Sequence, residues 1–213
     1  MTPNGFRLAG HRGRICELDP ISLMTIGLGA AWASGLNLYA TVLILGGLQY
    51  FGFVSLPPDL TVLSDPIVLV VAAVLYCVEF IADKVPGVDS VWDAVHTFIR
   101  IPAGALMAAG AVGGVEMGIS PEIITIAALV TGGAVSGISH ATKAGVRAMA
   151  NASPEPISNW LLSLLEDFLV LVGTLISAFK PIVFIVLLCI FIALAIWLLP
   201  KLWRGLRSLF QRK

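Results

Sequence analysis

Long runs of uncharged residues limit what this chain can fold into. The run 21–50 carries no acidic or basic side chain. A straight helix of that length measures about 45 Å, whereas the hydrocarbon core of a bilayer is about 30 Å thick. Only 12% of the 213 residues are charged, against about 25% in soluble domains. We therefore predict an all-α fold, a polytopic α-helical membrane bundle.

Short loops rich in proline, glycine or acidic residues separate the apolar segments. One transmembrane domain, 21–199, is expected between an N-terminal tail, 1–20, and a basic tail, 200–213. The tail 1–20 has no apolar core of the kind found in a signal peptide. The domain holds about six predicted spans, which are 21–50, 66–82, 90–115, 123–151, 157–178 and 181–199.

Two of the predicted spans are longer than a membrane crossing needs. In 21–50, the polar residues Ser34 and Asn37 flank Gly35. One interpretation is a long tilted helix whose small residues allow close packing. The other is a helix broken near Gly35, whose freed backbone groups line a polar site. The same two alternatives apply to 123–151.

Lysine and arginine gather on one side of the predicted topology. They occur in 1–20, at Lys84, at Lys143 and Arg147 and in 200–213, whereas on the other side the loops 51–65 and 116–122 have none and Lys180 stands alone. The positive-inside rule then places both termini in the cytoplasm. We expect a multi-pass protein of a bacterial cytoplasmic (inner) membrane.

The two halves of the chain show a weak similarity. Ser34-Gly35-Leu36-Asn37 resembles Ser136-Gly137-Ile138-Ser139, and the spacing of proline, serine and tryptophan in 86–92 resembles that in 154–160. An inverted repeat of three spans, 21–115 and 122–199, would explain the similarity. Chance similarity between apolar sequences would explain it equally well.

Charged residues in the second and third spans follow helical spacing. Asp89, Asp93, His96 and Arg100 lie at +4, +7 and +11, so a helix places them in one narrow stripe. Glu79 and Asp83, four residues apart at the end of the preceding span, also share a face. Such a stripe is expected to face protein or a water-filled cavity rather than lipid.

A second stripe follows the same spacing in the fourth span. It consists of Ser136, His140, Lys143 and Arg147, and Glu166 lies in the middle of the fifth span. Burying an Asp, Lys or Arg at a helix centre costs about 2.5–3.5 kcal/mol even on a lenient scale.

We therefore expect these side chains to converge between the second and fifth spans. Two alternatives stay open: the charges lie in the cytoplasmic interface, or they form a structural ion-pair network that fixes helix register. The predicted substrate- or ion-binding residues are Asn37, Glu79, Asp83, Asp89, Asp93, His96, Arg100, His140, Lys143, Arg147 and Glu166.

One motif resembles a known family, the bacterial membrane proteins catalogued as domain of unknown function 4126. The resemblance covers about 21–178, with Ala33-Ser34-Gly35-Leu36-Asn37 upstream of the motif. It implies an integral membrane protein and no particular activity or site residue. The motif reads Glu79-Phe-Ile-Ala-Asp83-Lys84-Val-Pro86-x-x-Asp89-Ser90-x-Trp92-Asp93-x-x-His96-Thr97-x-Ile99-Arg100-x-Pro102-x-Gly104.

Three functions fit these features. The first is a small transporter or permease for an ion or a small anionic solute. The second is a structural or assembly protein that docks a membrane partner or a second copy. The third, an intramembrane enzyme, has less support because His-Glu-x-x-His and Gly-x-Ser-x-Gly are absent. No catalytic residue, metal site or cofactor is predicted, and no basic cluster suggests nucleic acid.

Overall fold

The computed structural model describes residues 19–85, 87–113, 118–151 and 156–211, and every regular element in these ranges is a helix. This confirms the all-α bundle. Proline opens several of the helices, where its missing N–H would have had no partner. The elements are α1 (Pro20–Tyr50), the 3-10 helix η1 (Pro58–Ser64), α2 (Pro66–Ala82), α3 (Val88–Ala111), α4 (Pro121–Ala150), α5 (Pro156–Phe179) and α6 (Pro181–Gln211).

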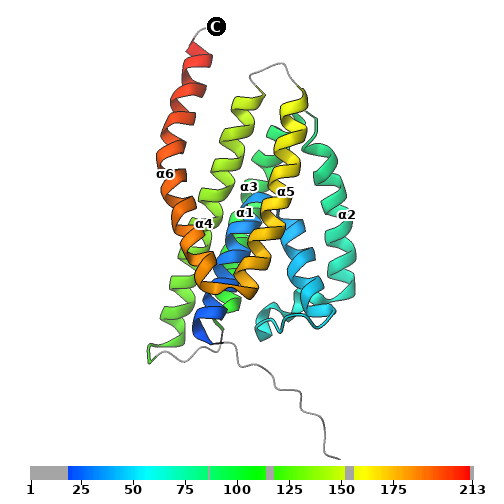
Figure 1. Ribbon diagram of the computed structural model, residues 1–213, viewed down its shortest axis with the longest axis vertical. Coiled ribbons are helices and arrows are strands. Elements are labelled where there is room, and N and C mark those ends of the chain that lie inside the picture. The colour runs from blue at the N-terminus through cyan, green and yellow to red at the C-terminus, as the bar shows by residue number, and fades with distance from the viewer. Residues whose placement is uncertain (1–18, 86, 114–117, 152–155, 212–213) are drawn as a thin grey trace, which may run out of the picture.

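The first helix is broken at its centre. Asn37 has φ −148° and ψ 100°, which is extended rather than helical backbone. Figure 1 shows α1 rising from the lower end of the bundle to its middle, and its second half returning to the same end. Of the two alternatives for 21–50, the broken helix is therefore the observed one. In contrast, α4 runs as one helix from Pro121 to Ala150.

Packing contacts place both ends of α1 at one end of the bundle. A methyl group at Gly27 would meet Ala111, in the last turn of α3. One at Gly46, near the other end of α1, would meet the backbone of Leu63 in η1. η1 in turn packs against the last turns of α3. α1 is thus a re-entrant hairpin.

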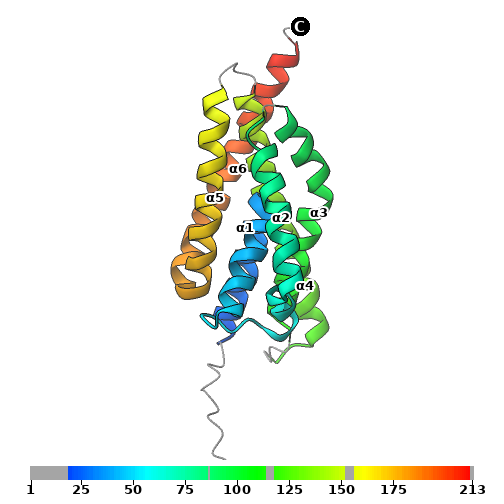
Figure 2. The same ribbon diagram turned by 90° about the vertical axis from the view of Figure 1, so that its right-hand side faces the viewer.

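The number of candidate spans agrees with the prediction of about six. Five helices, or six if η1 and α2 count as one span bent by 63°, are long and apolar enough to cross a membrane. The start of α1 and the end of α6 lie at opposite ends of the bundle (Figures 1 and 2). The placement of both termini in the cytoplasm stays a prediction. The tail 1–18, on which that expectation partly rested, lies outside the described residues.

Small residues let α3 and α4 approach closely. A Cβ at Gly104 would collide with Ser136, and one at Gly132 with Ala108. This pair shares the largest helix–helix contact in the described chain, followed by α1 with α3 and with α5. The glycine and alanine faces are therefore used inside the protein.

The proposed repeat gains no support from the helix shapes. Its two halves would begin with α1 and α4, of which the first is a broken hairpin and the second is continuous. The loop 152–155, which contains part of the second copy of the spacing, lies outside the described residues. The inverted repeat stays a prediction.

Candidate functional site

Charged side chains from α2, α3, α4 and α5 meet between the tip of the α1 hairpin and the upper end of the bundle. Arg100, Arg147 and Glu79 have no exposed surface. The other buried charged residues of this cluster are Asp83, Asp89, Asp93, Lys143 and Glu166, and we call all eight the charge cluster. The predicted convergence is therefore observed.

Arg100 lies at the centre of the charge cluster and joins α3 to α2. Its Nη2 donates to Glu79 Oε1 at 2.5 Å and its Nη1 to Asp93 Oδ1 at 2.9 Å. The spacing Asp93 to Arg100 is the +7 of the sequence stripe, which puts both groups on the same helix face. Two carboxylates thus stabilise one buried guanidinium.

His140 of α4 completes the surroundings of Arg100. Its Nδ1 lies 3.2 Å from Arg100 Nη1. Because a guanidinium can only donate, Nδ1 accepts and the ring proton lies on Nε2. Nε2 then donates to Thr97 Oγ1 at 2.7 Å, and Thr97 donates to the carbonyl of Asp93 at 3.0 Å. His140 is therefore held neutral by this geometry.

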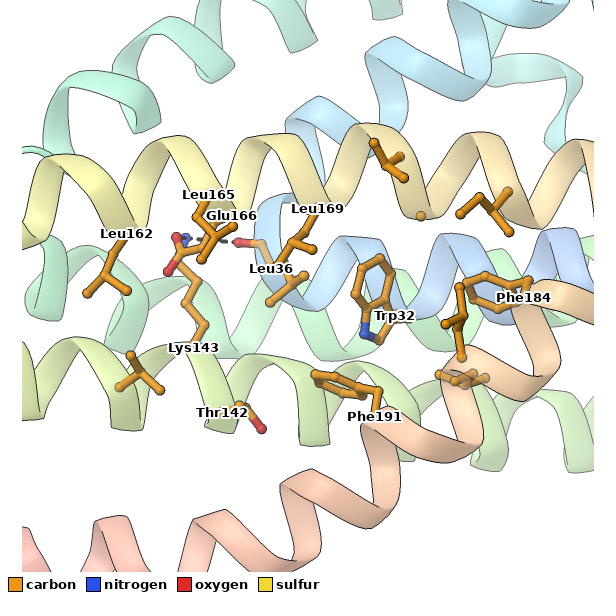
Figure 3. Close-up of a pocket in the computed structure, with 16 residues that line it drawn as sticks. Trp32, Leu36, Thr142, Lys143, Leu162, Leu165, Glu166, Leu169, Phe184 and Phe191 are labelled. Atoms are coloured by element: carbon orange, nitrogen blue, oxygen red, sulfur yellow. Dashed lines mark hydrogen bonds and ion pairs between the residues drawn. The ribbon is translucent and has the colours of Figure 1, made fainter.

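The ammonium of Lys143 lies among oxygen atoms from α1, α2, α3 and α5, of which Figure 3 draws those of Leu36 and Glu166. It donates to the carbonyl oxygen of Leu36 at 2.9 Å and to Asp83 Oδ2 at 3.1 Å. Glu79 Oε1 and Glu166 Oε2 each lie 3.4 Å away. The α1 break exposes the Leu36 carbonyl to this contact, so Lys143 binds both the backbone and the acids.

Arg147, one turn above Lys143, ties α4 to α5 and to the end of α2. Nε donates to Glu166 Oε1 at 3.0 Å and Nη2 to Glu166 Oε2 at 2.5 Å. The same guanidinium donates to the carbonyl oxygen of Asp83 at 2.8 Å and to its Oδ2 at 3.0 Å. This paired geometry is the strongest kind of protein ion pair.

Asp89 sits at the upper edge of the charge cluster and has a structural role. Its Oδ1 accepts from the backbone N–H groups of Gly87 and Ser90, at 2.8 and 2.7 Å. Asn151, at the end of α4, donates to both carboxylate oxygens, at 2.8 and 2.9 Å. Asp89 therefore fixes the start of α3 to the end of α4.

Asn37 organises the hairpin tip. Its Oδ1 accepts from the backbone N–H of Ala40 at 2.9 Å, which caps the second half of α1. Its Nδ2 donates to Asp167 Oδ1 at 3.0 Å. Ser139 of α4 donates to the carbonyl oxygen of Trp32 at 2.9 Å. The backbone groups freed by the break are thus bound by α4, as buried irregular backbone in a membrane requires.

His96 is buried but stands apart from the ion pairs. Its Nδ1 donates to the Trp92 carbonyl at 2.9 Å, and its Nε2 accepts from the Tyr39 hydroxyl at 3.0 Å. The Trp92 ring stacks on the imidazole with a 4.2 Å centroid separation. His96 therefore connects α3 to the hairpin rather than to the carboxylates.

Sequence reasoning left several polar partners out of the predicted site. Tyr39 and Asn151 are two of them. Asp167 is a third, which accepts from Asn37 and from the Tyr76 hydroxyl at 3.3 Å. Asp167 follows Glu166 directly in an otherwise apolar span, and this position was the feature of the sequence that could have indicated a role in the site.

Lys84 lies at the rim of the charge cluster, in the turn between α2 and α3. Its Nζ donates to the Phe80 carbonyl at 3.0 Å and to Ser163 Oγ at 3.3 Å. Partial burial lowers the pKa of Lys84 from its usual value, and the nearby carboxylates Asp167 and Asp83 oppose this shift. Lys84 thus adds positive charge to the edge of an acidic interior.

Acidic groups outnumber basic ones in the buried interior. Five buried carboxylates face three buried cations, and at half-buried positions Asp167 adds a sixth acid and Lys84 a fourth cation. Three carboxylate oxygens have no hydrogen-bond partner among the described residues. They are Glu79 Oε2, Asp83 Oδ1 and Asp93 Oδ2. The ammonium of Lys143 and the guanidinium groups of Arg100 and Arg147 all contact carboxylates, and Arg100 Nε is the nitrogen of this set that has no hydrogen-bond partner among the described residues.

The geometry does not suit a bound metal. Within the described ranges, no three His, Cys, Asp or Glu side chains converge in the way a metal ion needs. Lys143 and Arg100 occupy the space between the acids instead. The arrangement can hold charge and exchange protons, and it offers acceptor atoms.

The apolar helices and buried charges together define a multi-pass integral membrane protein. The chain belongs to the family described as Domain of unknown function (DUF4126), whose profile matches residues 24–201. The matched region contains the α1 hairpin and the whole charge cluster. No curated protein and no solved structure matches the chain.

Proposed function

We propose that this protein is a small transporter of the cytoplasmic membrane, and that its charge cluster binds a proton or a small cation during transport. The observation that carries this proposal is the surplus of buried acid, together with three carboxylate oxygens that have no hydrogen-bond partner among the described residues. Buried acceptors without a partner and excess negative charge in a membrane interior are costly, so protons or cations are expected to relieve them.

The sign of the charge favours a cation over an anionic solute. An anion would need a free basic group, but Arg100, Lys143 and Arg147 already contact carboxylates at 2.5 to 3.1 Å. The broken α1 supports the same function. Transporters commonly place substrate and ion sites at discontinuous helices near the middle of the bilayer.

Docking of a membrane partner is supported less well. The small-residue faces on which it would depend are those of α3 and α4, and they pack against each other. A purely structural ion-pair network would satisfy its own acceptors, whereas here acids remain in excess. For the orientation, Lys84 and the basic end of α6 favour a cytoplasmic upper end.

Flux through proteoliposomes tests the proposal. The purified protein would be reconstituted with a pH-sensitive or an alkali-cation-sensitive dye inside the vesicles, and entry of the matching ion would be driven by a membrane potential. We expect flux above that of empty vesicles, reduced about tenfold or more by Glu79→Gln and by Asp93→Asn. Glu122→Gln, at the exposed start of α4, is the control. Wild-type vesicles that match empty ones for every ion would refute the proposal.

A further inference from the structure

A long groove opens beside the charge cluster. It has a volume of about 350 Å³ and runs between α4, α5 and α6, with α1 as its floor (Figure 3). This lies within the ~300–1,000 Å³ typical of small-molecule sites. Apolar side chains make most of its wall. Those contributed by α5 and α6 include Leu165, Leu169, Ile176, Phe184, Leu188 and Phe191.

Three polar side chains line the groove next to the charge cluster, within a wall that is otherwise apolar. Glu166 and Lys143 line it together with Thr142. The Lys143 ammonium is surrounded by protein oxygens, whereas the Glu166 side chain keeps 11% of its surface exposed. Thr142 donates its hydroxyl proton to the Ile138 carbonyl at 2.8 Å, so towards the groove it offers an acceptor. A head group that binds here must donate hydrogen bonds or carry positive charge.

An unpartnered donor lies about one helical turn deeper. Trp32 is only 8% exposed, and its Nε1–H has no hydrogen-bond partner among the described residues. The six-membered ring of Trp32 packs against Gly173 of α5. The nitrogen edge therefore faces the α4 side of the groove, as Figure 3 shows. A buried N–H left unpaired is costly, and an acceptor on a bound molecule would relieve that cost.

The groove has the length of one acyl chain. From Glu166 to Ile176 the α5 axis covers ten residues, or about 15 Å. One leaflet of a bilayer contributes about half of the ~30 Å hydrocarbon core. Phe184 and Leu188 of α6 close the lower end. Leu36 and Trp32 are four residues apart, which separates the polar end from the indole nitrogen by about 6 Å.

We infer that this groove binds a single-chain lipid whose head donates hydrogen bonds or is cationic, and whose head–chain junction carries a carbonyl group. The head contacts Glu166 and Thr142, the carbonyl accepts from Trp32 Nε1, and the chain fills the apolar remainder. A peptide helix, about 10 Å wide, is too large for this volume. An anionic head would meet the acidic interior. Such binding does not depend on transport.

Lipid retention in native mass spectrometry tests the inference with three probes of equal chain length. Monooleoylglycerol has hydroxyl donors and an ester carbonyl, oleylamine has a cationic head without a carbonyl, and oleate has an anionic head. We expect the wild type to retain the first two about tenfold more strongly than oleate. Equal retention of oleate would overturn the inference.

Two variants separate the head contact from the carbonyl contact. Trp32→Phe removes the N–H and keeps most of the ring. It is expected to weaken the binding of monooleoylglycerol about fivefold, which corresponds to the loss of one hydrogen bond. The binding of oleylamine, which has no carbonyl group, is expected to stay unchanged. Trp92→Phe is the matched control, because Trp92 Nε1 is also buried and unpartnered but lies outside the groove. Glu166→Gln is expected to reduce the preference for oleylamine over oleate.

A comparison on the wild type keeps the test independent of mutant folding. The ether analogue of monooleoylglycerol lacks the carbonyl and is expected to bind about fivefold more weakly. Equal binding of ester and ether, or a Trp32→Phe variant that holds monooleoylglycerol as tightly as the wild type, would remove the assigned carbonyl contact and with it the inference.

Discussion

The ammonium of Lys143 lies 2.9 Å from the carbonyl oxygen of Leu36, at the point where α1 breaks. This carbonyl ends the first half of the hairpin, where the helix dipole is negative, so a cation is stabilised there. Carboxylate oxygens of Asp83, Glu79 and Glu166 complete the surroundings. Lys143 therefore occupies a position that a free monovalent cation would fill in its absence.

The first prediction follows from this cage of oxygens. Lys143→Ala removes the charge and leaves Leu36 and the acids in place, so the variant is expected to bind Na⁺ or K⁺ at the vacated position. Its melting temperature in detergent should rise with added Na⁺ or K⁺ and not with choline at equal ionic strength, because a ligand of the folded state stabilises it.

Two controls belong to that measurement. The wild type and Lys201→Ala, whose side chain is exposed, should show no difference between Na⁺ and choline. A Lys143→Ala protein that melts at the same temperature in all three salts would show that the oxygens collapse onto one another when the ammonium is lost.

The second prediction concerns the central ion pair. Arg100→Gln leaves Glu79 and Asp93 without their guanidinium, and breaking a buried pair costs about 3–5 kcal/mol. We expect most of the folded protein to be lost in size-exclusion chromatography. Arg100→Lys should retain part of the stability, since one ammonium cannot reach both acids with the same geometry. Arg204→Gln, on the exposed end of α6, should behave as the wild type.

The third prediction compares two glycines of the same helix. A methyl group at Gly35 would collide with Ser139 Oγ and the Ser136 carbonyl of α4. Gly35→Ala is therefore expected to destabilise the protein by about 1–3 kcal/mol, as overpacking does. At Gly47 a methyl group meets nothing within 4 Å, so Gly47→Ala should be neutral or slightly stabilising. Thermal unfolding of the two variants measures the difference. Equal melting temperatures for Gly35→Ala and Gly47→Ala would contradict the close packing of α1 against α4.

The fourth prediction tests the re-entrant hairpin. In a background without native cysteines, Asp19→Cys and Asp59→Cys should react with a membrane-impermeant maleimide from the same side of the membrane. Lys84→Cys and Ser208→Cys should react from the opposite side. The first pair lies just before α1 and in η1, at the lower end of the bundle, whereas the second pair lies in the turn after α2 and near the end of α6, at its upper end (Figure 1). Labelling of the first two positions from opposite sides would mean that α1 crosses the membrane.

Helix positions were largely predictable from the sequence. The predicted spans 66–82 and 157–178 coincide with α2 and α5 to within one or two residues, because proline opens each and the apolar run fixes its length. The last helix extends beyond the predicted span, since α6 continues to Gln211 through the basic tail. Charged residues in a helix beyond the hydrocarbon do not interrupt its backbone.

Helical spacing also identified the residues of the charge cluster. It put Asp93 and Arg100 on one face, where they pair, and His140, Lys143 and Arg147 on another. Spacing along one helix cannot tell which helix will face it, so the pairing of Arg147 with Glu166 was not predictable. The sequence left undecided whether the first helix breaks near Asn37, for the same reason. Asn37 caps the second half of α1 locally, but the turn also depends on contacts from α4 and α5, which the local sequence does not reveal.

The hairpin has a consequence for how the chain is made. The polar groups of its tip find partners in Ser136, Ser139 and Asp167, which follow Ser34 and Asn37 by 102 to 130 positions. At ~5–20 residues per second, a ribosome needs about 5 to 25 seconds to supply them. The polar tip of α1 thus leaves the ribosome several seconds before the α4 and α5 residues that complete its hydrogen bonds.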